Sequence, residues 1–205
     1  MNRLLTIFIS LIPLISSAQD ERLLERFYDS LSGSCVQLEY TYSARVSGIM
    51  NNGEGVLVNQ GPMWTVKGNG VEMYCDSATL WVLDPVLKEV VIEPAAAEAS
   101  SEFLDNPAIM FSRLKNEFVV SESRWMEGGD TRLYTLKPKT HMSIGYFNVE
   151  LDKDTAFVRR ASFALADGTL VKIEVSSMKL TPKISVEAFR PETVFDVEWI
   201  VTDLR

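Results

Sequence analysis

The side chains that most often carry catalysis are sparse in this sequence. Its one histidine, His141, lies in the polar segment KPKTHMS, and no G-x-S-x-G elbow is present to seat a serine nucleophile. With a single histidine a Cys/His metal cluster cannot be assembled, and no spacing of carboxylates matches a calcium loop. The dispersed glycines fit turns rather than a phosphate-binding loop. The sequence therefore predicts no enzyme activity, no metal and no cofactor, and a structural or solvated role for His141.

What the sequence does supply is apolar surface, concentrated in the stretch YCDSATLWVLDPVLKEVVIEP at residues 74–94. Because side chains alternate between the two faces of a strand, Trp81 and Leu83 lie on one face, and Leu80 and Val82 lie on the other. Both faces of this strand therefore need a cover. There are two interpretations. The strand belongs to an ordinary core, or it forms a binding face that helices or a ligand cover in turn.

A helix and a long strand precede this stretch. Residues 20–31 place their apolar side chains on one stripe and are followed by Gly33, which predicts an amphipathic helix. Residues 35–46, CVQLEYTYSARV, alternate apolar and polar side chains. This alternation predicts a long strand with one dry side and one wet side.

Short strands with hairpin-sized connections make up most of the remaining chain. We expect a turn from Gly48 to Gly53, because Asn51-Asn52-Gly53 is a turn sequence. A change of apolar parity at Ser176-Ser177 predicts a bulge in the last strand. The strands are expected at residues 55–60, 63–67, 71–76, 79–84, 86–93, 118–126, 132–138, 144–151, 157–165 and 170–182.

A second helix interrupts this series of strands. Residues 94–106 are small and polar, and Asn106-Pro107 suits the start of a helix whose apolar stripe contains Met110, Phe111 and Leu114. The pieces together predict a mainly β, α+β fold. Its core is a large, curved antiparallel sheet with two or more helices packed on one side.

The N-terminus is typical of an exported protein. Arg3, an apolar run to residue 15 and small residues before Gln19 predict a cleaved signal peptide at residues 1–18, followed by a single domain at 19–205. Position 19 is not a cysteine, so we expect a soluble periplasmic protein without a lipid anchor, and a monomer.

Composition and cysteine count limit the partners and the covalent chemistry. The formal net charge is −8 and no Lys/Arg cluster is present, which argues against a nucleic-acid partner. In an oxidising compartment a disulfide between Cys35 and Cys75 is permitted, and two separate thiols are the alternative.

The segment CDSATLWVLDP at residues 75–85 resembles the Asp-Gly-x-x-Leu-Trp-x-Tyr-(Asp/Asn)-Pro signature of the periplasmic outer-membrane lipoprotein carrier proteins, the LolA family. The same order of signals continues with Gly53-Glu54-Gly55, Gly61-Pro62, Asn106-Pro107 and YTLKPK at 134–139. The resemblance implies an unclosed β-barrel whose concave apolar face is covered by a helical lid.

The resemblance also implies a function and its partners. The family's carriers accept the acyl chains of lipoproteins released by an inner-membrane, ATP-driven complex, shield them and deliver them to the outer membrane, where an acceptor is a further expected partner. On this interpretation the candidate lid residues are Met110, Phe111 and Leu114. The candidate lining of the cargo cavity is Leu38, Tyr40, Tyr42, Trp64, Trp81 and Leu83.

One position departs from the family pattern. Well-known members carry an arginine directly before the proline that matches Pro62, where it latches the closed lid, and here that position is Gly61. Arg45 and Arg113 are the candidate substitutes. A second hypothesis is therefore a periplasmic lipid- or amphiphile-binding module of the same fold with different cargo. A third is a lipid-sensing adaptor that binds a protein partner, and a hydrolase using His141 comes last.

Overall fold

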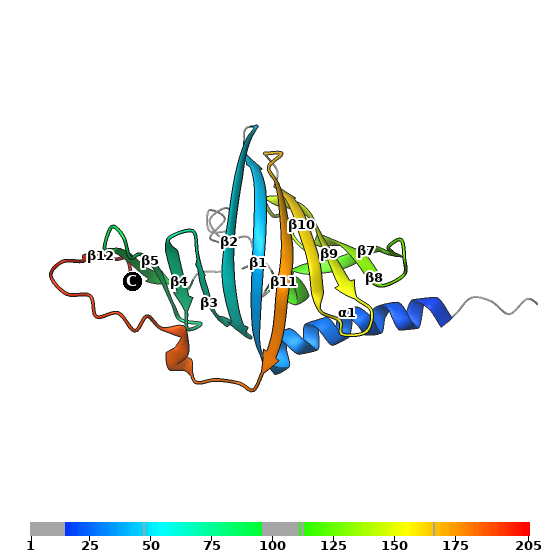
Figure 1. Ribbon diagram of the computed structural model, residues 1–205, viewed down its shortest axis with the longest axis horizontal. Coiled ribbons are helices and arrows are strands. Elements are labelled where there is room, and N and C mark those ends of the chain that lie inside the picture. Colours follow the sequence, from blue (N-terminus) through cyan, green and yellow to red (C-terminus); the bar gives the residue numbers. More distant parts are fainter. Residues whose placement is uncertain (1–14, 47, 96–110, 112, 166) are drawn as a thin grey trace, which may run out of the picture.

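The computed structural model describes residues 15–46, 48–95, 111, 113–165 and 167–205. Figure 1 shows one broad sheet with a long helix lying across part of it. The helices are α1 (Ile15–Gly33), the short α3 (Leu114–Glu117) and the 3-10 helix η2 (Val186–Phe189). The strands are β1 (Cys35–Val46), β2 (Ile49–Gln60), β3 (Met63–Gly68), β4 (Val71–Cys75), β5 (Thr79–Asp84), β6 (Glu89–Pro94), β7 (Phe118–Trp125), β8 (Thr131–Pro138), β9 (Ile144–Asp152), β10 (Val158–Leu165), β11 (Leu170–Thr181) and β12 (Ile200–Asp203).

The strands form one unclosed, curved 12-stranded sheet in the order β12-β6-β5-β4-β3-β2-β1-β11-β10-β9-β8-β7. All neighbours are antiparallel except β12, which runs parallel to β6. From β1 the chain runs outward to β6, and from β7 it runs inward again to β11. The connection between β6 and β7 therefore joins opposite ends of the sheet. The mainly β fold class and the unclosed curved sheet are confirmed.

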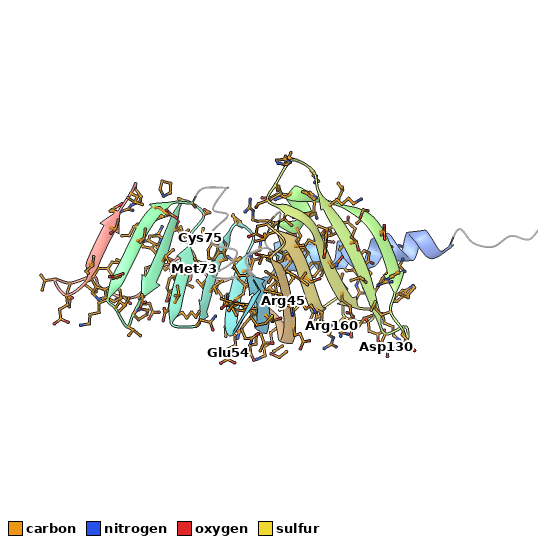
Figure 2. All side chains as sticks on the ribbon, turned by 90° about the horizontal axis from the view of Figure 1, so that it is seen from above. Arg45, Glu54, Met73, Cys75, Asp130 and Arg160 are labelled. Carbon is orange, nitrogen blue, oxygen red and sulfur yellow. The ribbon has the colours of Figure 1, made fainter. Side chains whose placement is uncertain are left out.

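The two faces of the sheet differ in what lies on them. On the inner face, Leu38, Leu57, Val66 and Met73 are successive cross-strand partners, and α1 packs against this face. The next positions along these strands point to the outer face, where Glu54 and Arg160 are exposed. Figure 2 shows Met73 and Cys75 on one side of the sheet and Glu54 and Arg160 on the other.

A bulge bends the sheet where its two halves meet. Glu39 pairs with Ser177 and Tyr40 pairs with Val175, so Ser176 is an extra residue in β11. The Ser176 hydroxyl donates a hydrogen bond of 3.0 Å to the Glu39 carbonyl. The bulge predicted at Ser176-Ser177 is confirmed.

The predicted turn at Asn51-Asn52-Gly53 is wrong. These residues lie within β2 and pair with Ala44, Ser43 and Tyr42 of β1. The chain reverses earlier, at Gly48, whose φ of +85° lies in the left-handed region that favours glycine. The long β1 offers a full row of pairing partners, and this tertiary pairing overrides a local turn preference.

Three glycines bring β2 and β3 close together and make room for tyrosine rings on the inner face. A Cβ added at Gly55 would lie 2.8 Å from the Tyr40 hydroxyl oxygen, and one added at Gly53 would lie 2.6 Å from the Tyr42 ring. At Gly68 an added Cβ would lie 2.2 Å from the Glu54 carbonyl oxygen. The obstacle at Gly68 is backbone, which cannot rotate away as a side chain can.

We expect Gly68→Ala to lower the free energy of unfolding by about 1–3 kcal/mol, because the new methyl group forces β2 and β3 apart. The matched control is Gly145→Ala in β9, where the nearest atom to an added Cβ is 4.0 Å away. Removing glycine there reduces the freedom of the unfolded chain, so this variant should keep or slightly raise the stability. Urea denaturation of both variants measures the difference, and equal stabilities would contradict the proposed close approach.

The C-terminal segment covers part of the outer face. After β11 it passes through η2, whose Phe189 is fully buried, and ends in β12 beside β6. Gln60 holds its start by donating to the Ile184 carbonyl (3.0 Å) and accepting from the Ile184 amide (2.8 Å). Arg190 pairs with Asp76 at 2.8 Å. Neither η2 nor β12 was predicted from the sequence.

Candidate functional site

The inner face and the elements that cover it form the larger of the two apolar clusters. Helix α1 contributes Leu23, Leu24, Phe27, Tyr28 and Leu31, all of which are buried. The helix predicted at residues 20–31 thus supplies one cover of the sheet. Its apolar stripe faces inward because positions three and four apart share one side of a helix.

Phe111 and Leu114, which precede β7, supply a second cover. Phe111 is 1% exposed, and its ring lies edge-on to Phe27 of α1 at 6.5 Å and to Phe147 of β9 at 6.0 Å between ring centroids. Phe147 in turn stacks on Phe163 at 5.7 Å. Leu114 is fully buried in the same cluster. Phe111 and Leu114 are therefore buried over the inner face, whereas Met110, the third candidate lid residue, lies outside the described residues.

Four of the six predicted lining residues lie together on the inner face. Leu38, Tyr40 and Trp64 are buried in the larger cluster, and the partly buried Tyr42 packs against it. The Tyr42 hydroxyl accepts a hydrogen bond of 2.6 Å from Asn69 Nδ2. Tyr40 and Tyr42 reach their places over the glycines of β2 described above.

The structure does not bring Trp81 and Leu83 together with the other four. Both belong to the second cluster, on the outer face, where the C-terminal residues Phe195 and Trp199 pack against them. The strand parity places Leu80 and Val82 on the inner face instead, in line with Cys75 and Met73. The choice of Trp81 and Leu83 as partners of Leu38 is corrected, because the aromatic side of β5 has its own cover within the chain.

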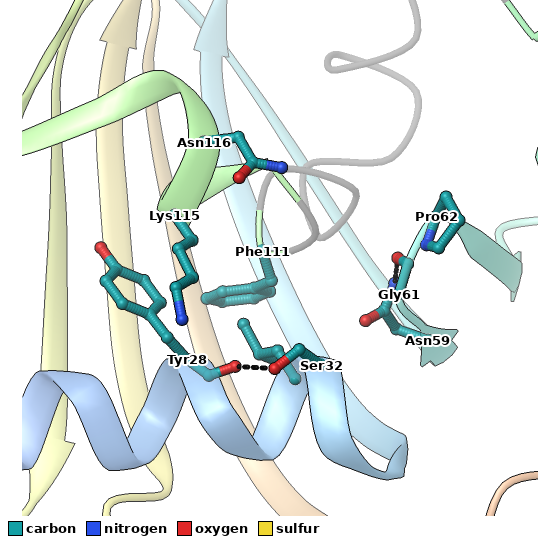
Figure 3. Close-up of a pocket in the computed structure, with 9 residues that line it drawn as sticks. Tyr28, Ser32, Asn59, Gly61, Pro62, Phe111, Lys115 and Asn116 are labelled. Atoms are coloured by element: carbon teal, nitrogen blue, oxygen red, sulfur yellow. Dashed lines mark hydrogen bonds between the residues drawn. The ribbon is translucent and has the colours of Figure 1, made fainter.

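A pocket of about 230 Å³ opens where α1, the β2–β3 turn and the segment at Phe111 meet. Figure 3 shows Lys115 beside Tyr28 above α1, and Gly61 on the opposite side of the pocket. The pocket is lined by Tyr28, Leu31, Ser32, Asn59, Gly61, Pro62, Phe111, Lys115 and Asn116.

Gly61, the predicted latch position, lies at this pocket with a φ of +62°. Nothing lies within 4 Å of a Cβ added there, so the backbone conformation, and not a lack of space, favours glycine. Arg113 pairs with Glu117 at 2.6 Å, and Arg45 is exposed on β1, so neither candidate substitute lines the pocket. Lys115 is the cation nearest to this position among the lining residues, and sequence reasoning missed it.

Lys115 connects the short helix α3 to α1. Its ammonium group lies 3.6 Å from the Asp29 carboxylate and 4.0 Å from that of Glu25, and 5.8 Å from the centre of the Tyr28 ring. These contacts are half exposed, so each stabilises this arrangement only modestly. Together they join α3 to α1.

Several other predicted features have no part in this site. His141 is exposed. Cys35 and Cys75 are two separate buried thiols. Within the described ranges, no three His, Cys, Asp or Glu side chains are grouped so that they could hold a metal ion. No helix among the described residues has the length and apolar character to cross a membrane.

Comparisons with known proteins describe the fold. No family model and no curated protein matches the chain. Among solved structures, the chain is similar to an uncharacterized conserved protein from Thermus thermophilus, with a TM-score of 0.54 and 12% identity over 90% of this chain and 98% of that one.

Two further structures carry the names that the sequence resemblance predicted. One is a LolA superfamily protein from Nitrosomonas europaea, with a TM-score of 0.48 and 11% identity over 84% of this chain and 97% of that one. The other is a putative outer membrane lipoprotein-sorting protein domain from Vibrio parahaemolyticus, with a TM-score of 0.46 and 10% identity over 83% and 97% of the two chains. Likeness at these identities concerns the fold.

The buried Tyr28 makes the stability of the protein depend on pH. Burial, followed by the nearby Glu25 carboxylate, raises the pKa of Tyr28 from 10.0 to about 12. A raised pKa means that the folded state favours the neutral phenol. The stability that this group contributes is therefore fully present below pH 10 and is lost as the pH rises toward 12.

We expect wild type to lose more stability than Tyr28→Phe between pH 10 and 12, because only wild type must ionise a buried phenol there. Urea denaturation of both proteins across this pH range gives the two free energies of unfolding. Other groups titrate equally in both proteins and cancel in the difference. A difference that stays constant with pH would contradict the assignment.

Proposed function

We propose that the protein is a periplasmic carrier that shields the acyl chains of lipoproteins on the inner face of its sheet and transfers them from the inner to the outer membrane. It acts by binding and release and needs no cofactor. The cargo replaces the segment with Phe111 and Leu114, and with it part of the contact to α1.

One observation carries this proposal. The inner face is covered by α1 and by Phe111 and Leu114, and both covers contact it through side chains rather than through strand pairing. Moving the segment at Phe111 thus breaks packing contacts and the half-exposed pairs of Lys115, and it leaves the 12-stranded ladder intact. A cover of this kind can exchange with another apolar molecule.

The energetics of exchange suit a carrier. Burying an acyl chain stabilises a complex by roughly 0.8 kcal/mol per methylene group. Closing the cover and burying the cargo are alternatives, so the free energy of closure is subtracted from the affinity. The cluster of Phe27, Phe111 and Phe147 therefore limits how tightly cargo binds and favours its release.

The proposed partners follow from this cycle. An ATP-driven complex in the inner membrane supplies acylated lipoproteins, and an acceptor at the outer membrane receives them. The signal peptide at residues 1–18 delivers the mature domain, residues 19–205, to the periplasm. The carrier works as a monomer, because its inner face is covered within one chain.

The direct test adds the mature protein and ATP to spheroplasts of the native host and recovers the soluble fraction. We expect lipoproteins to appear there in one-to-one complexes with the protein. The control omits ATP. Lipoproteins that stay on the membrane, while the same release machinery loads another carrier, would exclude the transfer function and leave the fold unaffected.

A charge on the inner face should separate binding from folding. Val82 is partly buried beside Met73, so a carboxylate there can reach water in the empty protein but is trapped against lipid when cargo enters. We expect Val82→Glu to fold and to weaken the binding of a fluorescent acyl probe by about tenfold or more, since an unpaired charge is costly to bury.

The matched control is Val56→Glu, which places the same charge on the outer face between Glu39 and Lys67. This variant should bind the probe as wild type does. Circular dichroism checks that both variants are folded. Equal binding by Val82→Glu and Val56→Glu would place the acyl chain elsewhere on the molecule.

Gly61 favours one alternative. In well-known members of the family that the sequence resembles, an arginine at this position latches the lid, and here it is absent. The second hypothesis is therefore that the protein binds a different amphiphile instead of lipoproteins. Lipid extraction and mass analysis of protein purified from its native envelope distinguishes the two. Co-purified lipoprotein supports the carrier, and another lipid supports the binding module.

A further inference from the structure

One polar side chain interrupts the apolar inner face. Asn59 of β2 is 1% exposed and is the cross-strand partner of Val36 on one side and Trp64 on the other. Beyond Trp64 the same row continues with Cys75 and Leu80, which are buried in the larger cluster. An amide in such a row needs partners for both ends, because burying an unpaired polar group is unfavourable.

Only one end of this amide has partners. Asn59 Nδ2 donates to the Gly61 carbonyl at 3.2 Å and to the Met63 carbonyl at 3.4 Å, which fixes the orientation of the amide. Its Oδ1 is buried and accepts no hydrogen bond from the described residues. The next residue provides the contrast, since the Gln60 amide both donates to and accepts from the backbone of Ile184.

The unpaired oxygen belongs to the pocket at Gly61. Figure 3 shows the Asn59 amide with its nitrogen turned to Gly61 and its other end toward the pocket. Phe111 and Leu31 line the same pocket. Because Oδ1 is buried in this arrangement, residues around the pocket must shift before another molecule can reach it.

The other polar groups that line the pocket indicate which kind of ligand group it can bind. Its cation, Lys115, already has the carboxylates of Asp29 and Glu25 beside it. Ser32 donates its hydroxyl hydrogen to the Tyr28 carbonyl at 3.1 Å, which leaves its oxygen as an acceptor. At Asn59 and Ser32 the pocket therefore offers acceptors to a ligand, and a hydrogen-bond donor meets this need better than an anion does.

We propose that Asn59 Oδ1 is a recognition site for a hydrogen-bond donor, an N–H or O–H group, at the head of the acyl chain that the inner face binds. This inference rests on the proposed function and adds a polar requirement to it. The acyl chain lies along the apolar rows of β1 to β5 once the segment at Phe111 has moved. Its first polar group then lies beside Asn59.

The same oxygen biases the protein toward loading. In the closed arrangement it is unpaired, and a buried unpaired acceptor destabilises the state that contains it. A cargo with a donor removes this deficit when it enters, whereas a purely apolar chain does not. Asn59 thus favours cargo that carries a donor over cargo that has only a chain of the same length.

The test compares ligands that differ only in the donor. N-palmitoylglycine has an amide N–H, and N-palmitoylsarcosine carries a methyl group in its place. Monopalmitoylglycerol and its dimethyl ether form the matching hydroxyl pair. Each ligand displaces a fluorescent acyl probe from the wild-type protein, and we expect the donor form to bind about tenfold tighter in at least one pair.

The outcomes separate the two proposals. A preference in the amide pair or in the hydroxyl pair supports the donor site and identifies its source. Equal binding within both pairs overturns the donor site while acyl binding stands. If none of the four ligands binds, the proposed function fails and the donor site fails with it.

Two variants assign the preference to Asn59. Asn59→Leu removes the acceptor, so the ratio between paired ligands should fall to about one. Asn116→Leu makes the same change at an exposed position of the same pocket and should keep the ratio. Asn59→Leu also loses the bonds to Gly61 and Met63, and if it does not fold, the wild-type ligand comparison still decides the question. A ratio that persists in folded Asn59→Leu would exclude Asn59 as the acceptor.

Discussion

The apolar inner face of a single curved sheet must be covered, and the rest of the structure depends on this requirement. In a sandwich a second sheet would do it, but here all described strands belong to one sheet. Helix α1 and the segment at Phe111 take that place. Their rings meet those of Phe147 and Phe163 in one continuous aromatic cluster. The protein thus keeps its largest apolar surface under elements that make no strand pairs with it.

The outer face is covered in a different way. The C-terminal segment is fixed by the Arg190–Asp76 ion pair, by the Gln60 amide and by the backbone pairing of β12 with β6. Moving it would break a strand ladder and polar contacts as well as packing. The two faces of the sheet therefore have one cover suited to exchange and one suited to permanence. This difference makes the inner face the better candidate for binding.

The fold was largely predictable from the sequence, because alternation of side chains identifies strands wherever one face is buried. Residues 35–46 are the clearest case, and the parity change at Ser176-Ser177 even located the bulge. The turn at Asn51-Asn52-Gly53 failed because a local preference competes with pairing to a long neighbouring strand. The alternation of side chains places Trp81 and Val82 on opposite faces of β5. It does not tell which of these is the inner face of the sheet, on which α1 packs. The four-residue β12 is too short to leave a periodic signal, and the unpaired oxygen of Asn59 depends on contacts between chain segments.

The position of β1 also governs the order in which the chain can fold. One edge of β1 pairs with the adjacent β2, and its other edge pairs with β11, which comes much later in the chain. At the end of this pairing, the hydroxyl of Thr181 donates a hydrogen bond to the carbonyl of Cys35, 146 residues earlier in the sequence. Pairings that distant are slow to form, because a long loop must close before they contribute. The two halves of the sheet can each assemble as local hairpins, but they join only when nearly the whole chain is present. A ribosome that still holds β11 therefore also holds the protein in two unjoined halves.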